Sequence, residues 1–126
     1  MVKLPIAEAD IVIFQGGTFD QVFFYETGEP PTPVNLSGYT AKMQIRSRPE
    51  SKAVILELST EAGNNRITLN YASNNGAIRL FISAADTAQL SPRDEAVYNL
   101  VIYNSSNGTS TPILQGKAII VAQITR

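Results

Sequence analysis

The sequence predicts an all-β fold: a single antiparallel β-sandwich, Ig-like or jelly-roll-like, with about eight strands and one short helical turn. Three observations support this prediction. Apolar and polar residues alternate in short runs, turn residues recur about every 8–12 positions, and no long stretch has the apolar spacing of a helix. The chain has 126 residues, which is the length of one domain.

Residues 1–9 are predicted to be an N-terminal arm, because Pro5 and the mixture of small and acidic residues show no regular period. Residues 10–126 are predicted to form the sandwich. No internal repeat and no linker divides this segment. The first strand is expected at 10–14, and it ends at Gly16 and Gly17, where the chain turns sharply.

The other strands are expected in chain order at 18–26, 39–46, 53–59, 66–70, 77–82, 95–103 and 112–124. The clearest of them is 39–46, in which Ala41, Met43 and Ile45 face the core and every second residue is polar. A bulge is expected at Gly116 in the last strand. Residues 27–33 contain three prolines and are predicted to form a surface loop.

Two segments differ from this simple alternation. Residues 18–26 carry aromatic side chains on both faces, so we expect one face on the core and the other against a neighbour. Residues 83–90 are predicted to form one or two helical turns. Ser83 followed by Asp86 fits an acidic variant of the capping box, and the helix must stop before Pro92.

The composition argues against catalysis. The chain has no histidine and no cysteine, which excludes disulfides and removes the usual zinc ligands and the Ser-His and Cys-His nucleophile pairs. The protein is therefore predicted not to be an enzyme, with no catalytic, metal or cofactor-binding residue and no cofactor. A glycosidase pair is the less favoured alternative for the acidic residues, which are expected on wet strand faces or in turns. These are Asp20, Glu26, Glu57, Glu61, Asp86, Asp94 and Glu95.

Three further patterns each have a structural and a functional interpretation. The Gln-Gly-Gly-Thr sequence at 15–18 is glycine-rich, but an aromatic strand follows it where a phosphate loop would have a helix. The basic stripe of Lys42, Arg46 and Arg48 is predicted to be the solvated face of a strand. The tyrosines are predicted to be half-buried strand residues, with a glycan groove as the alternative. They lie at positions 25, 39, 71, 98 and 103.

Charge and hydropathy limit the partners. The 10 basic and 11 acidic residues give a net charge of −1, so nucleic acid is not an expected partner. No apolar run reaches the length of a signal-peptide core or a membrane helix, so no membrane contact is expected. We expect the protein to stay in the cytoplasm or in a particle assembled there.

Two long segments resemble a known family. Residues 14–23 read FQGGTFDQVF, and after a proline-rich turn residues 34–46 read VNLSGYTAKMQIR. Both are similar to small structural proteins of tailed phages and prophages, which have a QG-TF pivot and a V-L-TGYTA-MQIR strand. Segments like 53–60, 66–70, 83–90, 97–103 and 114–121 follow in the same order, although Ser37 stands where the family usually has threonine and Ser-Arg-Pro follows Arg46.

The family is similar in pattern to the N-terminal β-sandwich of phage baseplate upper proteins. The resemblance implies a non-enzymatic structural component of a tailed-phage virion, assembled in the host bacterial cytoplasm. It favours a tail or baseplate adaptor that anchors fibres or spikes, in a symmetric oligomer with other phage structural proteins. Two alternatives stay open: a cement or decoration protein on the capsid, and a carbohydrate-binding sandwich that uses loop Tyr and Asn residues.

Overall fold

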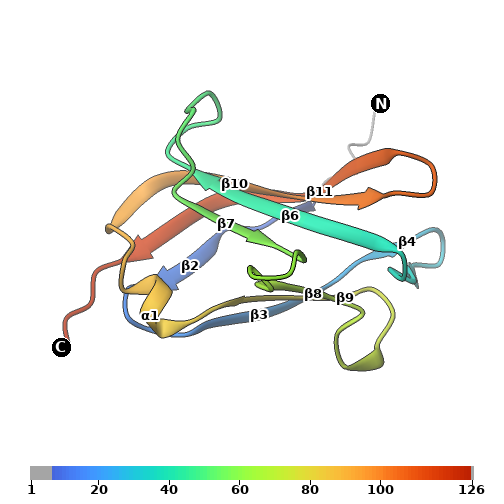
Figure 1. Ribbon diagram of the computed structural model, residues 1–126, viewed down its shortest axis with the longest axis horizontal. Coiled ribbons are helices and arrows are strands. Elements are labelled where there is room, and N and C mark those ends of the chain that lie inside the picture. The colour runs from blue at the N-terminus through green and yellow to red at the C-terminus, as the bar shows by residue number, and fades with distance from the viewer. Residues whose placement is uncertain (1–6, 126) are drawn as a thin grey trace.

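The computed structural model describes residues 7–125 and contains two β-sheets packed face to face, together with a small two-stranded sheet (Figure 1). The all-β sandwich predicted from the sequence is confirmed. The larger sheet has the order β1 (Ala7–Glu8), β11 (Thr109–Val121), β10 (Arg93–Asn104), β6 (Tyr39–Arg46) and β7 (Leu56–Ser59), and β2 (Ile11–Phe14) also pairs with β11. The smaller sheet has the order β3 (Phe19–Phe24), β9 (Ala77–Ile82) and β8 (Ile67–Leu69).

The eight strands expected from the sequence correspond to the eight described strands that are longer than two residues. The other strands are β1 and the pair β4 (Glu26–Thr27) and β5 (Thr32–Pro33). Strand β4 begins at the last residue of the strand predicted at 18–26, and β5 lies within the predicted surface loop 27–33. Boundaries differ at several ends. For example, β7 begins at Leu56, three residues later than expected, and β11 ends at Val121, three residues earlier.

The large sheet is not antiparallel throughout. Strands β1 and β2 run parallel to β11, whereas all the other described pairs are antiparallel. The sequence pattern could not show this, because a strand alternates in the same way whichever direction its partner runs. Strand β1 belongs to the segment 1–9 that was predicted to be an arm, and residues 1–6 of that segment lie outside the described part of the chain.

The bulge predicted at Gly116 is wrong. Gly116 lies directly opposite Tyr98 in regular register, and the extra residue of β11 is Ile113, between the Leu100–Leu114 and Val101–Pro112 pairs. Gly116 is needed for a different reason: a Cβ at this position would overlap the carbonyl oxygen of Ala9. The absence of a side chain lets the N-terminal segment cross close to β11.

The core lies between the two sheets and is built from alternate residues of their strands. Met43 and Ile45 of β6 are fully buried, as the sequence predicted, and Ile78, Leu80 and Ile82 of β9 face them from the smaller sheet. This packing of one apolar face on each sheet leaves the outer faces free for polar side chains.

A short helix connects the two sheets. Helix α1 (Ala84–Thr87) begins at Ser83, whose hydroxyl accepts a hydrogen bond from the backbone N–H of Asp86 at 3.2 Å, so the predicted cap is confirmed. Thr87 is buried and its hydroxyl donates to the carbonyl of Gly17 at 2.8 Å. A second short turn, the 3-10 helix η1 (Tyr71–Ser73), precedes β9 and was not predicted. Within residues 7–125, no helix is long and apolar enough to cross a membrane.

Candidate functional site

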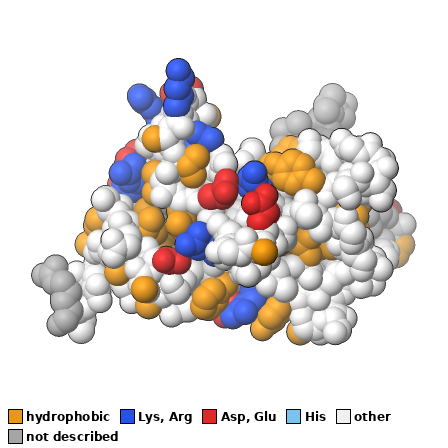
Figure 2. Space-filling view, viewed as in Figure 1, with side chains coloured by type: hydrophobic (Ala, Val, Ile, Leu, Met, Phe, Trp, Pro, Cys, Tyr) orange, Lys and Arg blue, Asp and Glu red, His pale blue; other side chains and the backbone are white. Residues whose placement is uncertain are grey.

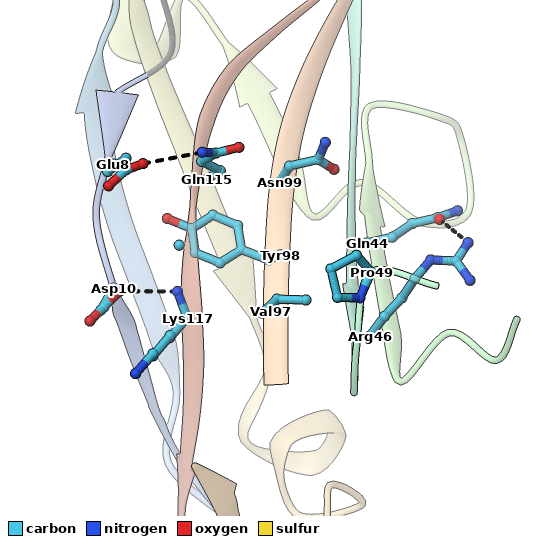
Figure 3. A pocket seen from close by; sticks show the side chains of 11 residues that line it. Glu8, Asp10, Gln44, Arg46, Pro49, Val97, Tyr98, Asn99, Gln115 and Lys117 are labelled. Atoms are coloured by element: carbon cyan, nitrogen blue, oxygen red, sulfur yellow. Dashed lines mark hydrogen bonds between the residues drawn. The ribbon is translucent and has the colours of Figure 1, made fainter. Parts of the chain in front are cut away.

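A groove of about 520 Å³ lies on the outer face of the large sheet (Figure 3). Its floor is a row of polar side chains, one from each of four neighbouring strands. Gln44 of β6 lies opposite Asn99 of β10, Asn99 lies opposite Gln115 of β11, and Gln115 lies opposite Glu8 of β1. Because these residues are direct partners in the pairing register, the row runs across the strands, with neighbouring members about 4.8 Å apart along the backbone.

A second row lies one outward position further along the strands. It contains Arg46 of β6, Val97 of β10 and Lys117 of β11, again directly opposite one another. Pro49, from the loop that follows β6, lines the groove near Arg46, and Asp10 lines it near Lys117 (Figure 3). The groove therefore has two basic and two acidic lining residues, since Glu8 is the other carboxylate.

Hydrogen bonds hold the side chains at the β6 side of the groove. The amide nitrogen of Gln44 donates to Glu57 Oε1 at 2.7 Å, and its oxygen accepts from the guanidinium of Arg46 at 2.6 Å. Arg46 also donates to the carbonyl of Ser51 at 2.6 Å. These contacts fix the positions of both side chains without any ligand.

The β1 side of the groove is held in a similar way. Gln115 donates to Glu8 Oε1 at 3.2 Å, and Asp10 Oδ1 accepts the backbone N–H of Lys117 at 3.0 Å. Between the two sides lies Asn99, which is exposed. Its side chain makes no hydrogen bond to any residue of the described part, so its amide is available at the centre of the groove.

Tyr98 lies beneath the groove floor and connects it to the core. Tyr98 is 4% exposed, and its hydroxyl donates to the carbonyl oxygen of Ala9. Burial, and to a smaller extent the charge of Asp10, raises the pKa of the Tyr98 hydroxyl to about 12. Tyr98 is therefore a neutral donor that holds the segment between β1 and β2 against the sheet.

The second candidate surface is a group of four apolar side chains, which we call the β2 apolar block. Val12 and Phe14 of β2 lie opposite Ile119 and Val121 of β11, on the outer face of the large sheet. Phe14 is 61% exposed, and Val12 and Val121 are also exposed. Among the described strands β2 pairs only with β11, so its other edge is open.

The third candidate surface is the outer face of the smaller sheet. Phe24 of β3 is 65% exposed and Val22 is exposed beside it. The guanidinium of Arg79 lies 4.7 Å from the ring centre of Phe81 and 5.0 Å from that of Tyr71. No described residue covers Phe24, so the neighbour expected on this face of residues 18–26 stays a prediction.

The acidic residues singled out in the sequence lie at exposed or half-buried positions, as predicted. Two of them form ion pairs: Asp20 with Arg79 and Asp86 with Arg66, each at 2.7 Å. The hydrogen bonds from these arginines lower the pKa of both carboxyl groups. In residues 7–125, no three acidic side chains are grouped so that they could hold a metal ion.

The tyrosines do not form a common face. Tyr98 is buried, Tyr103 is exposed on the outer face of the large sheet, and Tyr71 stacks with Arg79 on the smaller sheet.

Gly16 has a φ of +81°, which confirms the pivot predicted at Gln-Gly-Gly-Thr. In the basic stripe, Arg48 is paired with Glu50 at 3.6 Å, and Figure 2 shows Lys and Arg side chains gathered on the loop between β6 and β7, at the upper left.

Sequence reasoning missed the role of Gln15. Its amide nitrogen donates to the carbonyl of Leu90 at 2.9 Å, and its oxygen accepts the backbone N–H of Gln123 at 3.0 Å. It also missed the amide row of the groove. Its members lie far apart in the sequence, and only the pairing register of the strands brings them together.

No family model and no curated protein compared with this chain matches it.

Proposed function

We propose that this chain is a non-enzymatic structural component of a tailed-phage virion, most directly a tail or baseplate adaptor that anchors fibres or spikes. The family resemblance of residues 14–23 and 34–46 supports this proposal. The structural observation that carries it is the β2 apolar block, in which three exposed apolar side chains and the half-buried Ile119 lie beside an open strand edge.

An exposed apolar group beside an unpaired strand edge is typical of an interaction surface. A neighbouring subunit could pair its own strand with the open edge of β2 and bury Phe14 and Val12 at the same time. Full burial of one such side chain stabilises a contact by about 1.5–3 kcal/mol. Repeated by the symmetry of a particle, contacts of this size add up to a stable assembly. The proposed partners are therefore other structural proteins of the virion.

The non-enzymatic part of the proposal is supported by the state of the acidic residues. Asp20 and Asp86 are held as charged partners of Arg79 and Arg66, and the same contacts lower their pKa. A carboxylate with a lowered pKa is poorly suited to act as a general acid near neutral pH.

Electron microscopy with an antibody label tests the location. The sample is purified particles of the phage or induced prophage that encodes the chain. Label at the tail end is the expected result. Label spread over the head would replace the adaptor by the second candidate, a capsid cement protein, and particles without label would overturn the virion proposal.

A pair of variants tests the docking surface. Phe14→Ser should leave the melting temperature nearly unchanged, because the side chain is 61% exposed, but should strongly reduce incorporation into particles. Phe24→Ser is the comparison variant, since this side chain is similarly exposed but lies on the smaller sheet; reduced incorporation of Phe24→Ser alone would move the contact to the third candidate surface. Normal incorporation of Phe14→Ser, measured by quantitative mass spectrometry of particles, would exclude the β2 apolar block as the contact.

A further inference from the structure

We propose that the groove on the outer face of the large sheet is a saccharide-binding site for a ligand of one or two sugar rings. The groove volume of about 520 Å³ lies in the range of small-molecule sites. This proposal concerns a different surface from the β2 apolar block and does not depend on the virion role.

The position of the groove favours a ligand that is recognised by side chains. It runs across β6, β10 and β11, whose backbone groups pair with the neighbouring strands. An extended peptide gains most of its affinity from unpaired backbone groups at a strand edge, which the middle of this sheet does not offer. Sugar hydroxyls instead pair with amide, carboxylate and ammonium groups of side chains.

The groove offers donors and acceptors side by side. A hydroxyl group both donates and accepts, so a sugar needs both kinds of partner within a short distance. The amide of Asn99 supplies both, Lys117 supplies a donor, and the second oxygen of Asp10 supplies an acceptor. The planar amide of Asn99 can donate to one hydroxyl of a sugar ring and accept from its neighbour.

The charge balance favours a neutral ligand. Arg46 and Lys117 are opposed by Glu8 and Asp10, so an anion or a cation would meet two like charges in the groove. Val97 lies between Arg46 and Lys117 in its row, and Pro49 lies near Arg46. These two apolar side chains give the C–H face of a sugar ring a surface to pack against.

The groove is also ordered before a ligand arrives. Gln44, Arg46 and Glu8 are held by hydrogen bonds to other residues of the sheet and its loop. Ligand binding therefore costs little conformational entropy at these side chains, which raises the affinity of a small site. Asn99, at the centre, has the free amide that would make the decisive contact.

A nuclear magnetic resonance titration of ¹⁵N-labelled protein tests this proposal. The probes are glucose, galactose, N-acetylglucosamine and rhamnose, together with inorganic phosphate and an unrelated extended peptide. At least one sugar should shift the side-chain amide signals of Asn99 and Gln115 and the backbone signal of Val97 in a saturable way. Thr68, exposed on the other sheet, should not shift.

Asn99→Ala should weaken the binding of that sugar about 5–10-fold, the effect of losing one or two hydrogen bonds. Asn75→Ala is the matched control, because Asn75 is exposed in the turn before β9 and lies outside the groove. The affinity of this variant for the sugar should be unchanged. The dispersion of the amide signals verifies that both variants are folded.

Three results would overturn the proposal. The first is that none of the probes, whether sugar, phosphate or peptide, gives a saturable shift at the groove. The second is that phosphate or the peptide shifts these signals while all four sugars do not, which would indicate an ion site or a peptide site. The third is that Asn99→Ala binds the sugar as tightly as the unchanged protein.

Discussion

Three residues explain how the start of the chain is attached to the sandwich. Between β1 and β2, the Ala9 carbonyl lies so close to β11 that only glycine fits at position 116. The same carbonyl accepts a hydrogen bond from the hydroxyl of Tyr98, which belongs to the next strand of the sheet, β10. This buried contact is polar and has a neutral donor, so its strength depends on the protonation of one phenol.

We predict that the free energy of unfolding falls above pH 10. The pKa of Tyr98 is raised from 10.0 to about 12, so the unfolded chain loses this proton at lower pH than the folded protein. The stabilising effect is complete below pH 10 and is lost as the pH rises towards 12. The slope approaches about 1.4 kcal/mol per pH unit for one group. Urea unfolding at pH 9, 10, 11 and 12 measures it.

Tyr98→Phe is the control for this pH dependence. Removing the hydroxyl should cost about 1 kcal/mol at pH 8, because the Ala9 carbonyl loses its donor. Above pH 10, the free energy of unfolding of this variant should fall less steeply than that of the unchanged protein, because the variant lacks the hydroxyl that titrates. An equally steep decrease in both proteins would mean that Tyr98 is not the group responsible.

At the scale of single elements, β3 provides the sharpest comparison because two neighbouring phenylalanines point to opposite faces. Phe23 is half-buried and packs against the core, whereas Phe24 is 65% exposed. We predict that Phe23→Asp lowers the free energy of unfolding by about 3 kcal/mol or more, since a charge is placed against apolar side chains. Phe24→Asp should change it by only about 0.5 kcal/mol.

Thermal and urea melting of the two variants measure this difference. Because both introduce the same side chain one residue apart, general effects of charge and of strand propensity largely cancel. Equal melting of the two proteins would mean that the inward and outward faces of β3 are assigned incorrectly.

The strands show which features of this fold a sequence can predict. Strand β6 was predicted with the same bounds that the structure has, because its apolar and polar residues alternate regularly and the polar ones face the solvent. The cap of α1 was predicted from Ser83 and Asp86 for a similarly local reason. The parallel direction of β1 and β2 was missed, since direction depends on where a distant partner lies and leaves no local pattern.

The candidate site was harder to predict than the fold. Gln44, Asn99 and Gln115 are ordinary polar residues on three different strands, and their meeting depends on two pairing registers. The bulge at Ile113 adds to the difficulty, because one extra residue changes which side chains of β11 face outwards beyond it. The β2 apolar block was likewise hidden, since Val12 and Phe14 resemble core residues until their outward direction is known.

At the scale of the whole molecule, the two ends of the chain meet on one strand. Strands β1 and β2, from the start of the chain, pair with β11 at its end, and Gln15 accepts a hydrogen bond from the backbone of Gln123. The large sheet is therefore complete only when the first and last segments are both present. Contacts between such distant segments make folding slow and cooperative.

Two truncated chains test this dependence. A chain that ends at Val121 loses the contact of Gln123 with Gln15 and the exposed Ile124, so we predict a cost of about 1 kcal/mol. A chain that ends at Lys117 also loses buried Ala118 and Ile120 and leaves β2 without its partner, so we predict that it does not fold. Circular dichroism melting measures both, and cooperative melting of the shorter chain would mean that β2 does not depend on β11.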